Sequence, residues 1–588
     1  MPMDSTPPLT GFNVNNFIVC YIFIPAILWR TMARHLFLVA VLLSSFWYWP
    51  AAAADAPPQA AIASAHPLAT RAGMEILAAG GNAFDAAVAV SAALAVVEPA
   101  SSGLGGGGFW LLHLAKDGRD VMVDGRERAP LAARSDMYLD EHGEVIPHRS
   151  VDGPLAAAIP GEPAALVHLA RHYGRLPLAK SLAPAIRLAR EGFPVDDRYQ
   201  RLARFRLKVL RASSAAAAVF LHEGEAPEIG RLIKQPDLAA TLTALAKQGS
   251  DGFYRGRLAK QLVEGVRAAG GIWTEKDLSA YRVVERTPIS GEYRGWRITS
   301  AAPPSSGGVA LLTMLNILSG YDLEKMDEAT RTHVIVEAMR RAYRDRAEYL
   351  GDPDFVKMPV AQLIDPLYAA GLRAGIRLDR ATPSSALPGT ADENHSVDTT
   401  HFSVLDKQGN RVAATLSINF PFGSAFMAPG TGVLLNDEMD DFSAKPGVPN
   451  VYGLVGDDAN AIAPGKRPLS SMTPTFMESG RGVAILGTPG GSRIITMVLL
   501  AALNIAAGGD AASAVAVKRF HHQYLPDAIQ YEPDALPPPV IESLQSRGHH
   551  LRALNRHYGN MQVVWWGKQN NQVSAASDPR GQGLAEVK

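Results

Sequence analysis

The chain has 588 residues, of which 47% are hydrophobic and 19% are charged, as expected for a globular protein with a large core. Lys plus Arg and Asp plus Glu both number 57, giving a formal net charge of zero, and no basic run is interleaved with aromatic residues. This balance excludes a charge-driven affinity for nucleic acid or for anionic membranes.

The first part of the chain is typical of a targeting segment. The residues Met32-Ala33-Arg34-His35 precede the apolar run 36–49, and residues 51–54 are all alanine. A charged start, an apolar run and small residues at a cleavage site form the pattern of a secretory signal peptide. We predict a signal region over residues 1–54, with Met32 as the true start, and a secreted or periplasmic protein.

Two alternatives stay open for this segment. The apolar run 17–29 belongs to the protein if the signal is simply long, and the run 36–50 is an anchor if it is retained. Both runs are shorter than the roughly 20 residues that a membrane span requires. We therefore expect contact with a membrane only through the signal segment.

Cysteine and histidine usage argues against disulfide, thiol and metal chemistry. Cys20 is the only cysteine and precedes the predicted cleavage site, so the mature chain is expected to have no disulfide, thiol nucleophile or Cys-ligated zinc. The pairs His521-His522 and His549-His550 have no second cluster at metal-ligand spacing. We interpret them as surface or packing residues and predict no metal and no cofactor.

Two helices are predicted after the signal region. The first covers 66–79 and ends at Gly80-Gly81. Asn82 is a suitable N-cap for the second, alanine-rich helix, which ends near Val97, and Asp85 follows the cap by three residues. So many alanines indicate a helix packed closely against a flat surface.

A glycine run follows these helices and matches a dinucleotide-binding pattern. Gly103, Gly105 and Gly108 have the G-x-G-x-x-G spacing, and Asp124 lies about 20 residues further on. A nucleotide site needs a strand before the glycines and a helix after them, whereas here a helix precedes and a strand hairpin over 109–124 follows. We interpret the glycines as positions of close backbone packing.

The rest of the chain alternates between helical and strand patterns. Residues 160–380 have mostly helical patterns, and strands dominate after 399 except for an apolar helix over 492–507. A final hairpin is predicted over 561–566 and 572–576. Helices that flank antiparallel strands predict layered packing.

One of the predicted hairpins begins beside a polar, turn-prone loop. The loop covers 384–396, and Thr399 follows it. Strands are predicted over 401–405 and 412–418, with a turn at Lys407-Gln408-Gly409-Asn410. Taken alone, Thr399 is an ordinary start of a strand.

The chain resembles the γ-glutamyltransferases, also called glutathione hydrolases, of the N-terminal-nucleophile hydrolase superfamily. The resemblance extends in the family's order from about residue 60 to the C-terminus. The matching segments are Gly103–Phe109, Asp124–Pro130, Pro303–Gly308, Thr399–Val404, Leu435–Phe442, Lys466–Thr475 and Gly487–Arg493.

The resemblance implies a fold and a maturation step. The fold is α+β, a four-layer αββα sandwich formed as one domain by both halves of the chain. The precursor, a zymogen, cleaves itself between Asp398 and Thr399. The products are a large subunit of residues 55–398 and a small subunit of residues 399–588, which stay together as a heterodimer.

Cleavage before Thr399 would place a nucleophile and its base on one residue. The new α-amine has a reference pKa of roughly 7.7–8.0, so part of it is neutral near pH 7 and can accept the proton of the hydroxyl. Before cleavage, the same Oγ would attack the carbonyl of Asp398. The resemblance places Thr400 and Ser417 near Thr399, bonded to its amine or hydroxyl, and Ser417 stands where bacterial relatives usually have Thr.

Gly490 and Gly491 are the candidates for an oxyanion hole. They follow a strand over 483–486 and precede the apolar helix, where backbone N–H groups meet the positive end of the helix dipole. A plain turn between strand and helix is the alternative. We favour the oxyanion hole because of Thr399.

A γ-glutamyl group carries an α-carboxylate and an α-ammonium, so its pocket needs both signs of charge. Arg126 is the candidate for the carboxylate, because a guanidinium pairs with a carboxylate through two hydrogen bonds, and Ser470 and Ser471 would add hydroxyl donors. Taken singly, Arg126 is an ordinary ion-pair residue. The candidates for the ammonium are Asn419, Glu438 and Asp441.

We predict an enzyme that forms a γ-glutamyl ester on Thr399 and passes the acyl group to water or to an amino acid or peptide. Tyr452 resembles the lid residue of many family members. One alternative is a glutaryl-type β-lactam acylase, but its substrate has no α-amine to pair with Asp441. The other is an inactive paralogue that only binds its ligand, which the complete set of charged and hydroxyl residues disfavours.

Overall fold

The structure is a computed structural model, and it describes residues 56–387 and 399–588. The predicted signal region, Met32, Cys20, Asp398 and most of the polar loop before Thr399 lie outside these residues. Within the described part of the chain, no helix has the length and apolar character needed to cross a membrane.

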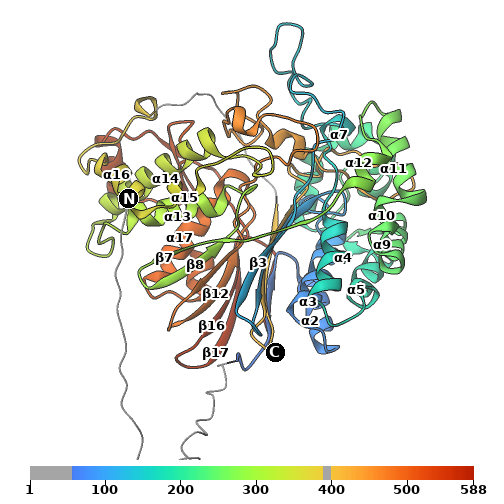
Figure 1. The fold of residues 1–588 in the computed structure, drawn as a ribbon, viewed down its shortest axis with the longest axis horizontal. Helices are drawn as coiled ribbons and strands as arrows, with labels where there is room; N and C mark the ends of the chain where they lie inside the picture. Colours follow the sequence, from blue (N-terminus) through green and yellow to red (C-terminus); the bar gives the residue numbers. More distant parts are fainter. Residues whose placement is uncertain (1–55, 388–398) are drawn as a thin grey trace, which may run out of the picture. The chain divides into compact units, whose positions relative to one another are not determined.

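Two antiparallel sheets lie at the centre of the unit formed by residues 57–588 (Figure 1). In spatial order, the first sheet consists of β18 (Leu584–Val587), β1 (Ala61–Ser64), β9 (Thr400–Leu405), β10 (Arg411–Ser417), β2 (Gly107–Leu114), β3 (Arg119–Gly125) and β6 (Val284–Arg286). The second consists of β17 (Gln572–Ser577), β16 (Gln562–Gly567), β12 (Gly482–Gly487), β11 (Thr475–Glu478), β8 (Trp296–Ser300) and β7 (Ile289–Tyr293).

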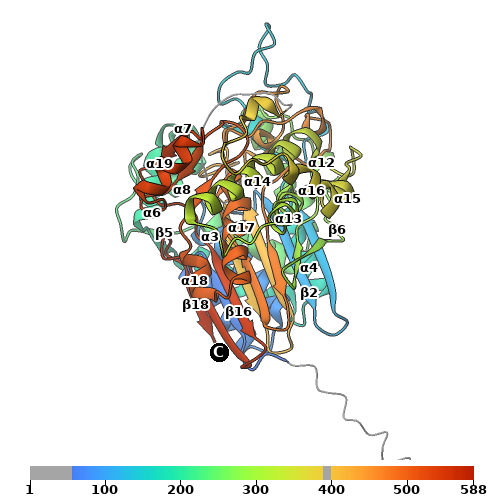
Figure 2. The ribbon, with the colours of Figure 1, turned by 90° about the vertical axis from the view of Figure 1, so that its left-hand side faces the viewer.

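Helices cover the outer face of each sheet, as Figures 1 and 2 show from two sides. Those beside the first sheet include α2 (Pro67–Ala78), α3 (Ala83–Val97), α4 (Glu162–His172), α5 (Leu178–Glu191), α9 (Pro236–Gln248), α10 (Asp251–Tyr254) and α11 (Gly256–Ala268). Those beside the second include α13 (Gly307–Leu318), α14 (Glu328–Tyr349), α16 (Pro366–Ala374), α17 (Ile494–Ala506), α18 (Ala511–Ala516) and α19 (Pro538–Ser546). The predicted four-layer αββα sandwich is therefore confirmed.

The remaining short elements lie at the edges of these layers. Their bounds are α6 (Asp197–Phe205), α7 (Leu207–Ala212), α8 (Ser214–Phe220), α12 (Glu275–Ala280), α15 (Val360–Leu363), β4 (Phe193–Pro194), β5 (Leu232–Ile233), β13 (Phe520–His521), β14 (Ile529–Tyr531) and β15 (Leu551–Ala553).

The helices after the signal region form as the sequence predicts. Asn82 accepts hydrogen bonds from the N–H groups of Phe84 and Asp85, and the Asp85 carboxylate accepts from the Asn82 N–H. This capping box satisfies donors that a helix start leaves free. Every residue of α3 is buried, so its alanines let it lie close to the first sheet.

The sequence prediction was incomplete in two places. The region 160–380 was expected to be mostly helical, yet β6, β7 and β8 lie within it, with a tight turn at Arg294 and Gly295, both of positive φ. The C-terminal part also contains α18, α19 and β18. These elements are short, and β18 forms by pairing with β1 at the opposite end of the chain, so local sequence patterns carry little signal for them.

Candidate active site

Thr399 immediately precedes β9, a strand in the interior of the first sheet. Leu416 of β10 pairs with Thr400, so the next pair along this antiparallel ladder places Ser417 beside Thr399. Side chains alternate between the two faces of a strand. His401 lies against Gly487 of the second sheet, and Thr399 therefore faces the space between the sheets.

Thr400 differs from its expected role beside the nucleophile. Its hydroxyl donates a 2.6 Å hydrogen bond to Oε2 of Glu98, which ends α3. Because Thr400 is one residue from Thr399, its side chain points to the opposite face of the sheet, towards the helices. The hydroxyl proton of Thr400 is committed to Glu98, which corrects the expectation of a bond to Thr399.

Ser417 and the glycine run are packed against each other. Oγ of Ser417 accepts a 2.8 Å hydrogen bond from the N–H of Asn419. A Cβ on Gly106 would lie 2.1 Å from the carbonyl oxygen of Ser417, so any larger residue would displace this strand. The run follows α3 and continues into β2, which begins at Gly107, so a strand and not a helix follows the glycines, as expected for close packing and not for dinucleotide binding.

Nine of the candidate residues line one small cavity of about 20 Å³, which is room for about one water molecule. These nine are Arg126, Thr399, Ser417, Asn419, Asp441, Tyr452, Ser470, Ser471 and Gly491. The structure thus brings together in one pocket residues that span most of the described chain. Thr400, Gly490 and Glu438 do not line this cavity, although Glu438 contacts Arg126 directly.

Arg126 is buried and paired with two of the acids that were expected beside it. Its Nη1 donates a 2.6 Å hydrogen bond to Oε2 of Glu438, its Nη2 donates to Oδ2 of Asp441, and its Nε donates to the carbonyl oxygen of Pro468 at 3.1 Å. These carboxylates raise the pKa of Arg126 against the opposing effect of burial. Arg126, the candidate for the substrate carboxylate, is therefore paired with Glu438 and Asp441, the candidates for the substrate ammonium.

Burial makes two of the acids near Arg126, Glu438 and Glu127, unusually hard to ionise. Burial raises the pKa of Glu438 to about 8; Arg126 and a hydrogen bond from Ser417 oppose this rise, while Asp441 adds to it. The pKa of Glu127 is also well above its ordinary value, first because of burial and then because of Glu438. An ionised side chain loses its hydration when it is buried, so the pocket favours a small net charge.

Asn419 is oriented by a residue that the sequence analysis did not single out. Its Nδ2 donates to Asp437 at 3.1 Å (carbonyl oxygen) and 3.2 Å (Oδ2), and Asp437 also accepts from the N–H of Phe420. With its amide nitrogen turned to Asp437, Asn419 keeps its Oδ1 as an acceptor for a ligand. Its left-handed backbone, φ 72°, is one that asparagine tolerates better than most residues.

The serine pair is held by the segment around Ser305 and Ser306. The N–H of Ser470 donates to the carbonyl oxygen of Pro304 at 2.8 Å, and Ser306 donates to the carbonyl oxygen of Ser470 through both its N–H and its hydroxyl. Oγ of Ser471 accepts from Arg346 of α14 at 3.4 Å. The Pro303–Gly308 motif therefore fixes the loop that presents the serines.

The two candidate oxyanion glycines have different surroundings. Gly491 has a φ of 53° and lies against the Tyr452 ring, and the short 3₁₀ turn Gly491–Arg493 leads into α17. Gly490 has a φ of 150° and borders a separate cavity of about 410 Å³. The structure places Gly491 in the Thr399 cavity and Gly490 on its outer side.

Tyr452 closes the cavity from the side of the loop 449–455. Its hydroxyl donates a 2.6 Å hydrogen bond to the carbonyl oxygen of Asn419, and Nε2 of Gln523 donates to the carbonyl oxygens of Tyr452 and Gly453. Tyr452 is only 5% exposed. Tyr452 is therefore a buried residue of the cavity wall, and its role as a lid stays a prediction.

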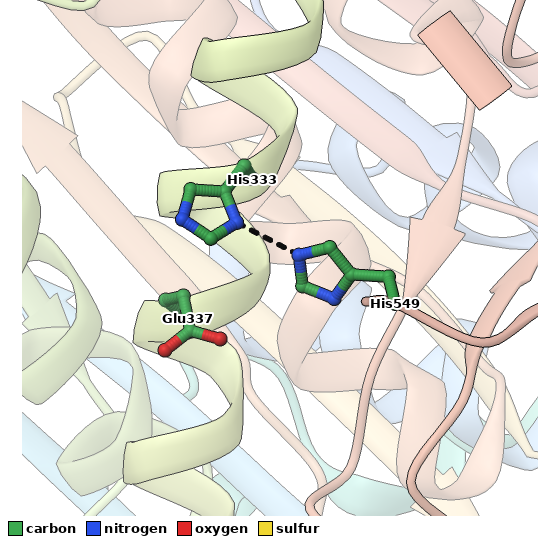
Figure 3. Close-up of side chains that lie close together, drawn as sticks. All are labelled: His333, Glu337 and His549. Atoms are coloured by element: carbon green, nitrogen blue, oxygen red, sulfur yellow. Dashed lines mark hydrogen bonds between the residues drawn. The ribbon is translucent and has the colours of Figure 1, made fainter. Parts of the chain in front are cut away.

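Away from this pocket, His333, Glu337 and His549 form a buried cluster (Figure 3). His333 donates from Nε2 to the carbonyl oxygen of Arg377, so its Nδ1 accepts from Nε2 of His549 at 2.7 Å. Arg341 donates to one oxygen of Glu337 and the N–H of Thr382 to the other. Among the described residues these are the side chains placed to hold a metal ion; Nδ1 of His333 and both Glu337 oxygens have hydrogen-bond partners, whereas Nδ1 of His549 is buried without one.

His521 and His522 are buried like His549. The histidine pairs therefore contribute packing residues, as expected. The sequence did not reveal the contact between His333 and His549 because the two residues are 216 positions apart.

The sequence analysis missed three polar residues that support the site. Glu98 bonds Thr400, Asp437 orients Asn419, and Arg346 bonds Ser471. Asp437 lies within the motif 435–442 and was the easiest to find. Glu98 and Arg346 lie on helices far away in the sequence, and only packing brings them to the site.

Two antiparallel sheets between helical layers, with a hydroxyl residue at the start of a central strand, define an N-terminal-nucleophile hydrolase. The sequence model of the gamma-glutamyltranspeptidase family matches residues 69–587. The chain belongs to this family.

Sequence and structure similarity to known proteins supports the assignment to this family. The chain is 43% identical over 564 residues to a glutathione hydrolase proenzyme of Escherichia coli (strain K12), covering 92% of this chain and 97% of that protein. It superposes on a cephalosporin acylase from Bacillus halodurans with a TM-score of 0.79 and 30% identity, covering 90% and 96% of the two chains. The gamma-glutamyltranspeptidase of Helicobacter pylori gives a TM-score of 0.54 at 40% identity, covering 57% and 97%.

The prediction of a γ-glutamyltransferase-type enzyme, made as a proenzyme, is confirmed at the level of the family.

Proposed function

We propose that this enzyme cleaves the bond between Asp398 and Thr399 and then hydrolyses or transfers the γ-glutamyl group of glutathione and related compounds. The observation that carries the proposal is the shared cavity of Thr399, Arg126, Asp441, Ser470 and Ser471. A hydroxyl nucleophile beside groups for both ends of a zwitterion fits a γ-glutamyl substrate. Residues 55–398 and 399–588 would be the large and small subunits.

The charges around Arg126 suggest how the substrate enters. The α-carboxylate of the substrate would replace Glu438 and Asp441 as the partner of the Arg126 guanidinium. It would also accept hydrogen bonds from the hydroxyl groups of Ser470 and Ser471. Its α-ammonium would pair with the released acids and with Oδ1 of Asn419. One set of buried ion pairs is then exchanged for another, so no charge is left without a partner. Because the cavity is small, Tyr452 would have to move to admit the substrate.

In the first chemical step, the Thr399 α-amine would accept the Oγ proton as Oγ attacks the γ-carbonyl carbon. The carbonyl oxygen becomes negative, and backbone N–H groups at Gly491 and its neighbour would stabilise it. The C–N bond of the amide breaks, and the proton passes from the Thr399 ammonium to the departing amine. The product is a γ-glutamyl ester of Thr399.

In the second step, water or the amine of an amino acid or peptide would attack the ester carbonyl carbon. A new C–O or C–N bond forms, the bond to Oγ breaks, and Oγ recovers its proton through the α-amine. This chemistry requires no metal and no organic cofactor. For glutathione, the group released in the first step is cysteinylglycine.

Intact-mass analysis of the purified protein beside Thr399→Ala tests the proposal. We expect two fragments from the natural chain, the smaller beginning at Thr399, and one uncut Thr399→Ala chain. The processed protein should release p-nitroaniline from γ-glutamyl-p-nitroanilide. A natural chain that stays uncut and inactive would contradict the proposal.

A glutaryl-type acylase is the second candidate, and the structural likeness to a cephalosporin acylase favours it. A glutaryl group has no α-amine, so it would leave the buried Asp441 and Glu438 without a cationic partner once Arg126 binds its carboxylate. We therefore expect γ-glutamyl-p-nitroanilide to be preferred over glutaryl-p-nitroanilide by at least tenfold in kcat/KM. The reverse preference would establish the acylase.

We also propose that residues 1–54 direct the protein to the periplasm or the outside of the cell and are then removed. Sequencing the N-terminus of the large subunit isolated from each cell fraction tests this. A start near residue 55 outside the cytoplasm is expected. A protein that keeps residues 36–50 in the membrane fraction would identify an anchor instead.

A further inference from the structure

An open groove of about 840 Å³ lies directly outside the lid. Its walls include Phe420, Asn450 and Val451, which are chain neighbours of the cavity residues Asn419 and Tyr452. The opposite wall is formed by α6 and α7. The groove and the Thr399 cavity are therefore lined by neighbouring residues of the same two chain segments.

Three aromatic rings lead from the surface of this groove to the lid. The Phe205 and Phe420 rings lie 5.7 Å apart at 60°, and the Phe420 and Tyr452 rings lie 6.5 Å apart at 64°. These edge-to-face contacts are favourable arrangements of aromatic rings. Phe420 is 6% exposed, but Phe205 is 62% exposed. The exposed Phe205 ring therefore offers the groove an apolar contact surface that continues through Phe420 to Tyr452.

Two cations beside Phe205 lack an ion-pair partner among the residues that the structure describes. Arg201 lies one helical turn before Phe205 on α6, so both are on the same side of the helix, and Lys208 follows on α7; all three line the groove. Within residues 56–387 and 399–588, neither Arg201 nor Lys208 has a hydrogen-bond or ion-pair partner. Arg206 differs, because it pairs with Asp152 at 2.8 Å and donates to the carbonyl oxygen of Gly423.

The acids of the groove are also engaged. Asp152 pairs with Arg206, while Asp440 accepts from the Ser150 hydroxyl at 2.7 Å and from the N–H of Val451 at 2.9 Å. The exposed cations are therefore the charges that remain for a ligand, and they select an anion. Arg201 also borders the neighbouring cavity that contains Gly490, so the cationic rim reaches the candidate oxyanion loop.

We propose that this groove holds the peptide part of the substrate: the leaving peptide in the first step and the acceptor peptide in the second. Arg201 and Lys208 would bind its terminal carboxylate, and Phe205 would pack against an apolar side group. The inference rests on the proposed function and extends it from the γ-glutamyl group to the rest of the substrate.

The chemistry of the ester requires one subsite for both peptides. The leaving amine departs from the γ-carbonyl carbon, and the acceptor amine attacks the same carbon; when the acceptor is a similar peptide, the second step is the reverse of the first. In that step the C–N bond forms, the C–Oγ bond breaks and the amine proton reaches Oγ through the Thr399 α-amine. An extended dipeptide is about 7 Å long, which is comparable with the 6.5 Å between the Tyr452 and Phe420 ring centres.

The preferred substrates follow from these groups. A γ-glutamyl peptide with a free carboxylate should be better than a γ-glutamyl amide without one. Thiol conjugates of glutathione with an aromatic substituent on sulfur should gain further from Phe205.

The double variant Arg201→Gln/Lys208→Gln tests the carboxylate contact, with Arg204→Gln as control. Arg204 is exposed on the same helix but does not line the groove. The readout is kcat/KM for glutathione divided by kcat/KM for γ-glutamyl-p-nitroanilide, whose leaving group has no carboxylate. We expect the ratio to fall about tenfold in the double variant and to stay within twofold in Arg204→Gln. An unchanged ratio in the double variant, or an equal fall in the control, would overturn the inference.

A second variant tests the aromatic contact independently. In Phe205→Ala, the preference for S-benzylglutathione over glutathione should fall about fivefold, and Phe205→Tyr should retain it. Equal preference in all three proteins would show that Phe205 does not bind the substituent. If the natural protein cleaves γ-glutamyl-p-nitroanilide but these ratios do not respond, the groove inference fails while the proposed function stands; if it cleaves neither substrate, the proposed function fails.

Discussion

The Tyr452 hydroxyl donates a 2.6 Å hydrogen bond to the carbonyl oxygen of Asn419, and this contact joins the proposed lid residue to another residue of the pocket. Asn419 is itself a candidate ligand for the substrate ammonium, and Asp437 holds its amide nitrogen. The lid therefore closes on a residue whose orientation is already fixed. Opening requires one hydrogen bond and the packing of one ring to be broken.

Tyr452→Phe should loosen the lid without removing the ring. A net hydrogen bond of this kind is worth about 1 kcal/mol, so the open state should become several-fold more populated. A looser lid admits water more readily, so we expect the ratio of hydrolysis to transfer with glycylglycine to rise two- to fivefold. The ratio is measured by separating free glutamate from γ-glutamylglycylglycine. An unchanged or lower ratio would show that this bond does not control access of water.

Gly491→Ala should abolish activity by steric conflict with the lid. A Cβ at this position would lie 2.8 Å from the Tyr452 ring, and φ is 53°, which disfavours any residue with a side chain. We expect kcat/KM for γ-glutamyl-p-nitroanilide to fall at least 100-fold. Gly480→Ala is the matched control, because a Cβ there has no atom within 4 Å and activity should be retained. Full activity in Gly491→Ala would mean that the loop and lid move apart freely.

Arg126→Gln should impair both binding and stability. Glu438 and Asp441 would lose their cationic partner in a buried site, a change that typically costs about 3–5 kcal/mol. We expect a lower unfolding temperature together with a fall of at least 100-fold in kcat/KM for γ-glutamyl-p-nitroanilide.

Arg126→Lys separates the two effects. A lysine keeps the charge but cannot form paired hydrogen bonds with a carboxylate. It should restore most of the unfolding temperature while KM stays raised at least tenfold. Equal KM values for Arg126→Lys and the natural protein would contradict the assignment of Arg126 to the substrate carboxylate.

Glu162, the first residue of α4, should make stability depend on pH. Burial raises its pKa to about 8, and the Gly103 backbone offsets only part of this effect. The folded state thus binds a proton that the unfolded state, with an ordinary glutamate pKa near 4.3, releases. The stabilisation is complete below about pH 4 and is lost as the pH rises through 8, with a total of about 3–5 kcal/mol.

Glu162→Gln should remove this contribution, since its amide does not titrate. Urea-induced unfolding measured at pH 5 and at pH 8.5 gives the comparison. We expect the natural protein to lose more stability than Glu162→Gln over this interval. Equal losses would show that Glu162 is ionised in the folded protein.

Much of the site could be identified from the sequence because its residues lie in short, recognisable segments. The hairpin that begins at Thr399, the capped helix after Asn82 and the glycine run before β2 all depend on local physics: alternation, capping and backbone freedom. The resemblance also supplied the nine candidate residues that line one cavity, six of which lie within its matching segments.

The tertiary structure decided which groups face one another, because those contacts join segments far apart in the chain. Alternation along β9 could be foreseen, but only the packing of α3 shows that Thr400 meets Glu98. Arg126 and Glu438 are 312 residues apart, and only the folded chain shows that their side chains are hydrogen-bonded to each other. The groove beside Phe205 likewise exists only because α6 and α7 pack beside the lid, leaving an aromatic ring and two cations in water where no local pattern could place them.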